Sequence, residues 1–257
     1  ANVIPIPLKH QPVKKLHPVS LLLLIFSLAG LAWLPIVKPA SSRTLSASVA
    51  EKPVPETKNN EAVFNALYDS LDLDDKGLSE EAFRYAVRGY EHMLEDHRIE
   101  KPGYLTICDF SRSSNSKRLF LIDMSEGKLV KYTYVAHGRN SGAEFASNFS
   151  NRPESLQSSL GFYITGETYI GQHGLSLRVN GIEKGINDNA YQRAIVVHGA
   201  NYIGEKWGGS YMGRSFGCPA VPAAESAQLI NTIKNGSVLF IYHPTASYLK
   251  GSKILNG

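Results

Sequence analysis

The apolar pattern at the start of the chain predicts a membrane segment. Residues 16–37 are almost wholly apolar, and 19–34 within them carry no charge, while several lysines precede them. This length suits one membrane-spanning helix, and the lysines predict an inside amino terminus with an exported remainder. We therefore expect residues 1–37 to be an anchor in the inner membrane, with a cleaved signal segment as the alternative. Either interpretation places the rest of the protein in the periplasm or elsewhere outside the cytoplasm.

A polar linker and then a helical period follow this segment. Residues 38–59 are rich in proline, serine and charge, a composition typical of a flexible spacer. From residue 60 the apolar positions recur at helical spacing, and Ser79 suits the N-cap of the second run. Residues 60–100 are therefore predicted to form a helical hairpin. Its apolar faces are Val63, Ala66, Leu67 and Leu71, and then Phe83, Ala86, Val87, Tyr90, Met93 and Leu94.

The acidic turn between these helices has some features of a calcium-binding loop. With Asp72 as position one, Gly77 falls at position six, as such a loop requires. Lys76 then falls at five, however, and Phe83 at twelve, where a bidentate glutamate is needed. We therefore expect a helix-helix turn here and no calcium site.

From residue 101 the period changes to that of β-strands. Short runs rich in aromatic and β-branched residues alternate with turn residues, and one helix with Pro222 in its first turn interrupts them. A long polar stretch, residues 139–159, lies between two strands, and a loop of this length is usually functional, as a lid or a groove wall. The period alone predicts many short strands and few helices. The strand runs are 104–110, 119–124, 129–136, 161–165, 175–179, 194–197 and 238–242, and the helix is 222–234.

Composition narrows the choice of partners. The chain has 257 residues, a hydrophobic content of 43% and a formal net charge of +4, which are ordinary values for a globular protein. Its lysines and arginines are scattered, so we expect no nucleic-acid partner, while a weak attraction to an anionic polymer fits the charge. Of the two cysteines, Cys108 lies in a strand pattern and is expected to be a buried free thiol rather than a disulfide partner.

Candidate chemistry gathers around the other cysteine, Cys218. It lies in a turn beside Gly217, and an apolar run that ends in His198 precedes it. A thiol with a pKa of ~8.5 is mostly protonated at neutral pH, and a histidine within hydrogen-bond reach can take its proton. We therefore expect Cys218 to be a nucleophile and His198 its general base. The N–H groups of Gly217 and Cys218 are candidates for an oxyanion hole, and Ser215 for orienting either side chain.

These motifs resemble a known family. His198-Gly199 at a strand end, followed by Ser215-Phe216-Gly217-Cys218, is similar to the L,D-transpeptidase (YkuD-type) domain of bacterial cell-wall enzymes. Phe216 stands where many members carry histidine, and Pro219-Ala220 where many carry an apolar residue and then a polar or basic one. The wider sequence, roughly Lys101 to Pro244, resembles the branch called murein L,D-transpeptidase catalytic domain. The segments that carry this likeness are Tyr163–Tyr169, His173–Leu177, Asn187–Ala190 and Gly213–Pro222.

The resemblance implies a fold and an activity. The fold is mainly β, a bent sheet or sandwich over residues 101–257, with the helical hairpin ahead of it and one helix after the cysteine. The activity is acyl transfer on peptidoglycan stem peptides through a thioester on Cys218. An acceptor amine then takes the acyl group, giving a 3→3 cross-link or an anchored protein. With water as acceptor the same site is an L,D-carboxypeptidase, and neither outcome needs a cofactor.

Further residues are candidates for contact with the substrate. His173 and His137 each precede a glycine, as His198 does, and Gly199 follows His198. Arg214 suits the free carboxylates of a stem peptide. The histidines and Cys218 match no zinc spacing, so no metal site is expected. Weaker candidates for carboxylate binding are Arg139, Arg178 and Arg193.

Other classes of protein fit less well. Papain-like hydrolases usually have their cysteine before their histidine, and sortases have an arginine after their cysteine. Here His198 precedes Cys218 and no arginine follows. The non-enzymatic alternative is a membrane-tethered module that binds the wall without turnover.

Overall fold

The computed structural model describes residues 57–205 and 207–257. The expected membrane segment 1–37 and almost all of the expected linker 38–59 lie outside this part of the chain. Within it, no helix is both long and apolar enough to cross a membrane.

In the part of the chain that the structure describes, two helices come first, α1 at Thr57–Ser70 and α2 at Glu80–Glu95. Ser79 caps α2 as predicted, because its hydroxyl accepts a hydrogen bond from the Ala82 N–H at 3.1 Å. The buried side of α2 includes every predicted residue except Leu94, which is 36% exposed. Its buried residues are Ala82, Phe83, Ala86, Val87, Gly89, Tyr90 and Met93.

The predicted face of α1 is partly wrong. Val63 is 66% exposed, whereas Phe64, Tyr68 and Leu71 are buried. The Phe64 and Tyr68 rings pack against Phe83 of α2, with ring centroids 4.9 and 5.5 Å apart. Aromatic rings bury more apolar area than a valine does, so these rings decide which face of α1 turns inward.

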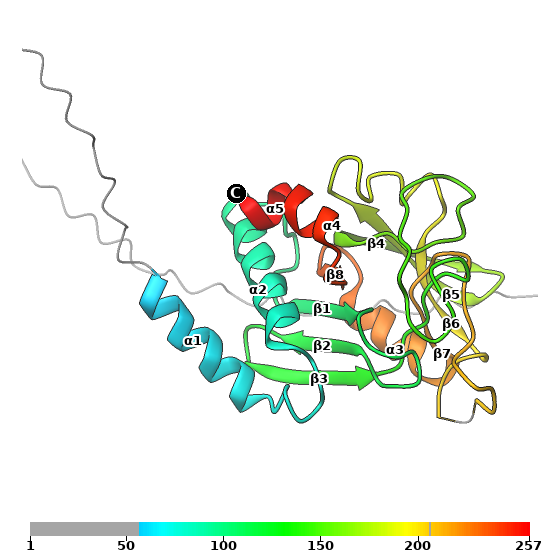
Figure 1. Cartoon of the computed structure of the whole chain (residues 1–257), viewed down its shortest axis with the longest axis horizontal. Coiled ribbons are helices and arrows are strands. Elements are labelled where there is room, and N and C mark those ends of the chain that lie inside the picture. Colours follow the sequence, from blue (N-terminus) through cyan, green and yellow to red (C-terminus); the bar gives the residue numbers. More distant parts are fainter. Residues whose placement is uncertain (1–56, 206) are drawn as a thin grey trace, which may run out of the picture. The chain divides into compact units, whose positions relative to one another are not determined.

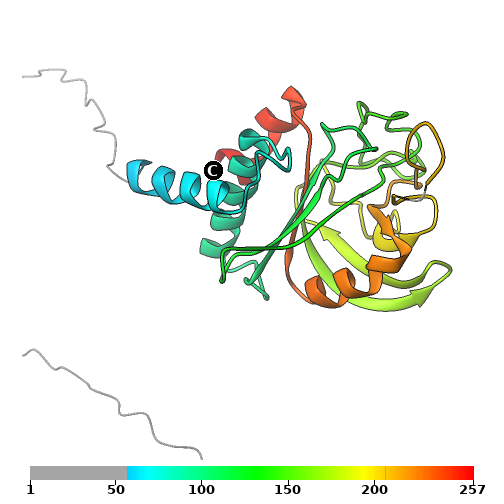
Figure 2. The ribbon, with the colours of Figure 1, turned by 90° about the horizontal axis from the view of Figure 1, so that it is seen from below.

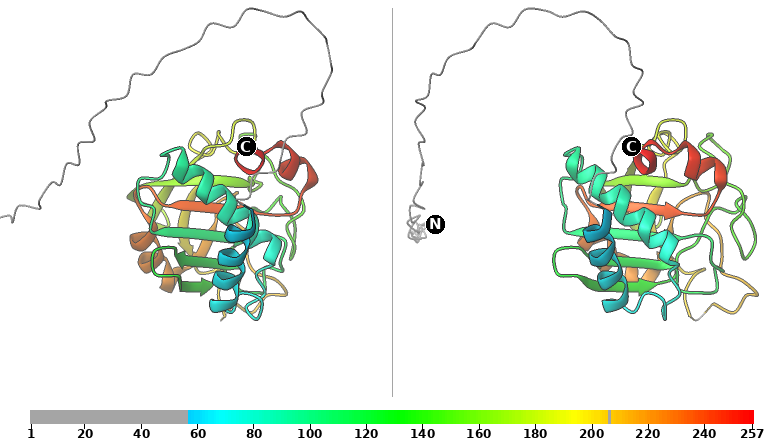
Figure 3. Two further views of the ribbon diagram at one scale, coloured as in Figure 1. Left: turned by 90° about the vertical axis from the view of Figure 1, so that its left-hand side faces the viewer. Right: turned by 60° about the vertical axis from the view of Figure 1, so that its left-hand side comes forward.

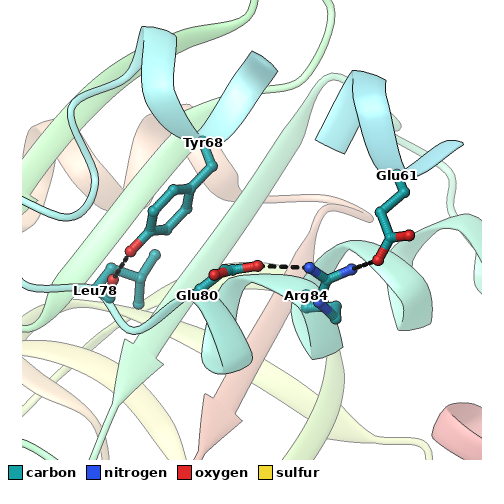
Figure 4. A network of polar contacts seen from close by, with 5 residues as sticks. All are labelled: Glu61, Tyr68, Leu78, Glu80 and Arg84. Atoms are coloured by element: carbon teal, nitrogen blue, oxygen red, sulfur yellow. Dashed lines mark hydrogen bonds and ion pairs between the residues drawn. The ribbon is translucent and has the colours of Figure 1, made fainter. Parts of the chain in front are cut away.

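Polar contacts also fasten α1 to the start of α2 (Figure 4). The Tyr68 hydroxyl donates to the Leu78 carbonyl, and the Arg84 guanidinium pairs with Glu61 of α1 and with Glu80. The ion pairs are partly exposed and contribute little. The buried tyrosine bond joins backbone hydrogen bonds, such as Leu78 N–H to the Leu73 carbonyl at 2.9 Å, in holding the turn between the helices.

Eight strands form one sheet in the order β3-β2-β1-β8-β4-β5-β6-β7 (Figure 1). β1 with β8 and β6 with β7 are parallel pairs, and the other neighbours are antiparallel. The inner strand β8 is buried along its whole length, which explains its continuous apolar sequence. The bounds are β1 Tyr104–Asp109, β2 Leu119–Asp123, β3 Lys128–Thr133, β4 Gly161–Gly171, β5 Gly174–Gly181, β6 Val196–Ala200, β7 Ala220–Pro222 and β8 Val238–Tyr242.

The two edges of this sheet approach each other. β3 and β7 are the edge strands, yet the Ala136 N–H, just beyond β3, donates to the Ala220 carbonyl of β7 at 2.8 Å. Two residues further on, Gly138 pairs with Ser215. The sheet is therefore nearly closed, and the seam runs directly beside the turn that holds Cys218.

Helices flank the sheet in two groups. α2 lies across β1 and β8 (Figure 3), and the C-terminal helices α4 (Ala246–Gly251) and α5 (Lys253–Asn256) gather on its side of the sheet (Figure 2). α3 at Ala223–Ile233 packs against β5, β6 and β7. The close approach of α2 depends on Gly89, since a Cβ there would lie 2.0 Å from the Phe162 ring of β4.

The architecture is mainly β with a helix after the cysteine, as predicted. The sequence period missed β7, which is short and ends in a proline, and it missed α4 and α5. It also ended the fourth strand at residue 165, whereas β4 continues to Gly171. A register shift between Thr165 and Thr168 breaks the alternation there, so the second half of β4 carries no continuous strand pattern.

Candidate active site

Cys218 lies in the turn that enters β7, next to the start of β6. Parallel pairing sets His198 opposite Ala220, so Cys218 lies two residues before the position that faces His198. Gly217 permits this turn: its φ is 123°, and a Cβ there would lie 2.8 Å from the Gln157 carbonyl oxygen. The expected glycine turn is therefore present, and it is closely packed.

The Cys218 thiol faces the backbone at the start of β6. Its Sγ donates a weak hydrogen bond to the Ala194 carbonyl, at 3.7 Å. Burial raises the pKa of the thiol, while a hydrogen bond from the Val196 backbone and the positive charge of Arg193 lower it. The resting thiol is therefore protonated and needs a base, but a thiolate, once formed, has a donor and a cation beside it.

His198 is 2% exposed and holds a defined tautomer. Its Nδ1 lies 3.0 Å from the Gly199 carbonyl, and only an N–H satisfies that oxygen, so Nε2 keeps the free lone pair. Burial lowers the pKa of His198, and the nearby His173 lowers it further, against the opposite effect of the Gly199 carbonyl. His198 is therefore neutral near pH 7, which is the form a general base requires.

Within the part of the chain that the structure describes, no hydrogen bond joins His198 to Cys218. The Sγ donates to the Ala194 carbonyl instead. Resting catalytic pairs are often longer than the working geometry and tighten when substrate binds.

His173 covers His198 from the tip of the β4–β5 hairpin. The two rings stack with centroids 4.2 Å apart and an interplanar angle of 19°. The register that pairs Ser176 of β5 with His198 of β6 carries the tip to this place. His173 is itself exposed, so it lies where a substrate that arrives from solvent can touch it.

Ser215 ties the cysteine turn together. Its hydroxyl donates to the Cys218 carbonyl at 2.6 Å and accepts from the Gly217 N–H at 3.1 Å. The Gly217 N–H is therefore occupied, in conflict with its expected place in an oxyanion hole. Of the two expected donors, the Cys218 N–H is the one that has no partner among the described residues.

His137 lies beneath this turn and not in a substrate groove. It is fully buried, and its carbonyl accepts a hydrogen bond from the Ser215 N–H at 3.0 Å. Its Nδ1 lies 2.7 Å from the guanidinium of Arg118, which is also fully buried. Burial and then the Arg118 charge lower the pKa of His137 to about 4. This position contradicts the predicted substrate contact, because a neutral, enclosed imidazole supports the turn from below.

A family model described as the L,D-transpeptidase catalytic domain matches residues 74–242, more than half of the chain. The chain belongs to this family. Solved structures that the chain resembles at TM-scores below 0.5 include L,D-transpeptidases from three bacteria. The chain covers less than two thirds of the length of each. They come from Mycobacterium smegmatis (12% identity, 55% of this chain and 59% of that one, TM-score 0.35), Xylanimonas cellulosilytica (18%, 55% and 60%, 0.32) and Stackebrandtia nassauensis (16%, 63% and 65%, 0.33). No match was found among curated proteins.

Two further predicted residues of this L,D-transpeptidase domain have packing roles. Gly199 is buried, and a Cβ there would lie 2.6 Å from the Ser226 hydroxyl of α3, so its lack of a side chain admits the helix. This contradicts the predicted substrate contact of Gly199. Arg214 donates to the carbonyls of Gly142 at 2.8 Å and Arg139 at 3.2 Å. It is only half-buried, so carboxylate binding by Arg214 stays a prediction.

Arg193 has a more central place in the L,D-transpeptidase site than its sequence indicated. Its guanidinium donates to the carbonyls of Ser150, at 2.8 Å, and Gln157, at 2.5 Å. These bonds fasten the polar stretch 139–159 to the segment just before β6. No acidic side chain pairs with Arg193 among the described residues, so its charge acts on Cys218. Its partners lie 36 and 43 residues away, and no local sequence pattern marks such contacts.

The remaining arginine candidates, Arg178 and Arg139, each contact another side chain. Arg178 pairs with Glu167 at 2.8 Å, so its charge is already matched. The Arg139 guanidinium lies over the Phe216 ring, 5.8 Å from its centroid, and Phe216 is 64% exposed. Phe216, one of the departures from the family pattern, is therefore a mostly exposed ring in the turn that holds Cys218.

Proposed function

We propose that this protein is a cysteine-dependent acyltransferase acting on the stem peptides of peptidoglycan. One observation carries the proposal: Cys218 lies beside a cation, Arg193, and next to the strand that holds a neutral histidine with a free Nε2. Membership of the L,D-transpeptidase catalytic domain family supports the substrate class. Activity requires the cysteine side chain to rotate from Ala194 toward His198.

The first half-reaction forms a thioester. His198 Nε2 takes the proton from the Cys218 thiol, and the thiolate attacks the carbonyl carbon of the third stem-peptide residue. The C–N bond to the fourth residue breaks, and the imidazolium gives its proton to the departing amine. The Cys218 N–H is the donor with no partner in the resting turn, and it suits the oxyanion.

The second half-reaction decides the product. An acceptor amine attacks the thioester carbonyl, loses a proton to His198 and receives the acyl group, while the Cys218 thiol reforms. A stem-peptide amine gives a 3→3 cross-link, and an amine of a protein gives an anchored protein. Water in the same position gives an L,D-carboxypeptidase. The exposed side chains of His173 and Phe216 are our candidates for contacts with the acceptor.

This substrate also suits the location expected from the sequence. Peptidoglycan lies outside the cytoplasmic membrane, so we propose an extracytoplasmic catalytic domain. The anchor at residues 1–37 and the division of the chain at residues 60 and 101 stay part of this proposal.

The test is intact-mass analysis of the full chain incubated with a disaccharide-tetrapeptide wall fragment. We expect release of the terminal D-amino acid, a transient acyl adduct on Cys218 and dimeric muropeptide. Cys218→Ala and His198→Ala should give none of these. Cys108→Ala is the matched control, because Cys108 is buried in β1 and should keep the activity.

Two other outcomes would change the assignment. Release of the D-amino acid without dimer, in the presence of an acceptor peptide, would make the protein a carboxypeptidase. No release, and no Cys218 adduct even with a carbapenem as acylating agent, would contradict the enzyme hypothesis. The non-enzymatic alternative, a module that binds the wall, would then be favoured.

A further inference from the structure

A cavity lies against the loop whose carbonyls bind Arg193. It has a volume of about 520 Å³. It is lined by the segment 147–151 with Gln157 and Leu160, by residues 185 and 186, and by Thr245, Ser247 and Tyr248 at the start of α4. The mechanism above uses neither this cavity nor the side chains that line it.

The lining of this groove is polar but carries no carboxylate, ammonium, guanidinium or imidazole. Its polar groups are the amides of Asn148, Asn151 and Gln157 and hydroxyls such as Ser247, and its apolar groups are the rings of Phe149 and Tyr248 with Leu160 and Ile186. The amides of Asn151 and Gln157 already bond within the protein, so Asn148 is the amide that a ligand can reach. A ligand with free carboxylates or phosphates would lose its hydration here without meeting a cation. An uncharged ligand rich in hydroxyl and amide groups would find donors and acceptors of matching kind.

The Phe149 ring adds a flat apolar surface among these polar groups. Phe149 packs against His243, with ring centroids 4.9 Å apart, and this contact holds the ring in place. The side-chain amide of Asn148 can still bond to a ligand, since within the described residues it bonds only to the adjacent Ser147 hydroxyl. A sugar ring has this combination: an apolar C–H face, and hydroxyl and acetamido groups around its edge.

The groove is joined to the nucleophile turn through shared backbone. Gln157 lines the groove, while its carbonyl accepts from Arg193 at 2.5 Å and touches Gly217. The next residue, Ser158, donates from its hydroxyl to the Gly217 carbonyl at 3.1 Å. Residues 157 and 158 therefore border both the groove and the turn that holds Cys218.

We propose that this groove binds the glycan strand of the wall polymer, an uncharged segment of N-acetylated amino sugars, while the stem peptide reaches Cys218. This inference rests on the proposed function for its second half, because it takes the substrate of Cys218 to be a stem peptide that is joined to glycan. The groove thus selects peptides carried on a glycan over free peptides.

The experiment measures glycan binding apart from turnover. The probes are peptide-free glycan strands and an N-acetylglucosamine oligomer, titrated calorimetrically against the full chain carrying Cys218→Ala. We expect binding that Phe149→Ala and Asn148→Ala each weaken about tenfold, the loss of roughly one or two good contacts. Asn231→Ala, an exposed asparagine on α3, is the matched control and should bind as the parent does.

A second readout covers folding and kinetics. Because Phe149→Ala alters a packed ring, its thermal unfolding is compared with that of Asn148→Ala, a substitution at an exposed side chain. In the active enzyme, both groove variants should raise KM for glycan-bearing fragments more than for a sugar-free tetrapeptide. The proposal is overturned if the glycan strands do not bind, or if all variants bind them equally. Failure of the proposed function is a separate result, seen as absence of Cys218 acylation in the wild type.

Discussion

The ring of His173 stacks on the ring of His198, with centroids 4.2 Å apart and an interplanar angle of 19°. This one contact contributes both to the burial of His198 and to the adjacent positive charge that opposes its protonation. Burial is the larger cause of the lowered pKa of His198, and His173 supplies part of that cover. The hairpin tip thus keeps the proposed base neutral at pH values where a free histidine would be protonated.

Replacing His173 tests this relationship. His173→Ala removes both the cover and the charge, so the pKa of His198 should rise. The acidic limb of the kcat/KM profile should move to higher pH, and the rate at pH 6 should fall severalfold, since less of the base is neutral. NMR titration of the imidazole checks the pKa directly. His173→Phe keeps the stacked ring without the charge, so its profile should lie between the two. An unchanged acidic limb in His173→Ala would show that other residues keep His198 buried.

Arg193 should control both the thiol and the loop. Arg193→Met removes one cause that lowers the pKa of Cys218, so that pKa should rise further above its usual value. Alkylation of Cys218 at pH 7, followed by peptide mass mapping, should slow about two- to tenfold. Limited proteolysis within residues 150–157 should speed up, because the loop loses its bonds to the guanidinium.

Two substitutions separate these effects. Arg193→Lys keeps the charge and loses the fork of donors, so alkylation should stay close to wild type while proteolysis still accelerates. Arg152→Met removes an exposed arginine of the same loop and should change neither. Equal alkylation rates in Arg193→Met and wild type would contradict the electrostatic role.

The sequence allowed the strands and the turn around this site to be predicted, but not the contacts between buried side chains. Val238–Tyr242 was predicted at its observed bounds, because a strand buried on both sides is a continuous apolar run. Cys218 was recognisable because Gly217 marks a sharp turn. His137, by contrast, was predicted to touch substrate, and it lies against Arg118 in the interior. Such pairings arise only when distant strands come together, so neither periodicity nor a motif contains them.

Gly217 should be intolerant of any side chain. Gly217→Ala puts a Cβ 2.8 Å from the Gln157 carbonyl and 3.0 Å from the Ile195 side chain, at a φ of 123°. Strain alone costs about 1–3 kcal/mol, and the turn must shift to relieve the close contacts. We expect lower stability in urea unfolding and at least tenfold slower acylation of Cys218 by a carbapenem. Gly185→Ala has a positive φ of 80° but open space around it, so it reports strain alone and should leave acylation intact. Comparable acylation by both variants would argue against a tightly packed turn.

Glu183 should make stability depend on pH. Its carboxylate accepts from the Phe162 N–H at 2.8 Å, the Tyr248 hydroxyl at 3.1 Å and the Ser252 hydroxyl, and so joins β4 to the C-terminal helices. Burial nevertheless outweighs these bonds and raises its pKa. The folded state therefore holds this proton more tightly than the unfolded state does. The stabilising effect of Glu183 is full below its unfolded pKa and is lost as pH rises through its folded pKa.

Glu183→Gln removes that titration. We expect the variant to be about 0.5–1.5 kcal/mol less stable than the wild type at pH 4, where the protonated acid keeps its bonds. The difference should shrink or reverse toward pH 7, because burying the ionised Glu183 costs free energy, whereas glutamine stays neutral at every pH. Urea unfolding across this pH range measures it. Glu126→Gln, at an exposed turn, should follow the wild-type curve. A constant gap between Glu183→Gln and wild type would mean that Glu183 keeps one protonation state throughout this range, since only its titration produces the slope.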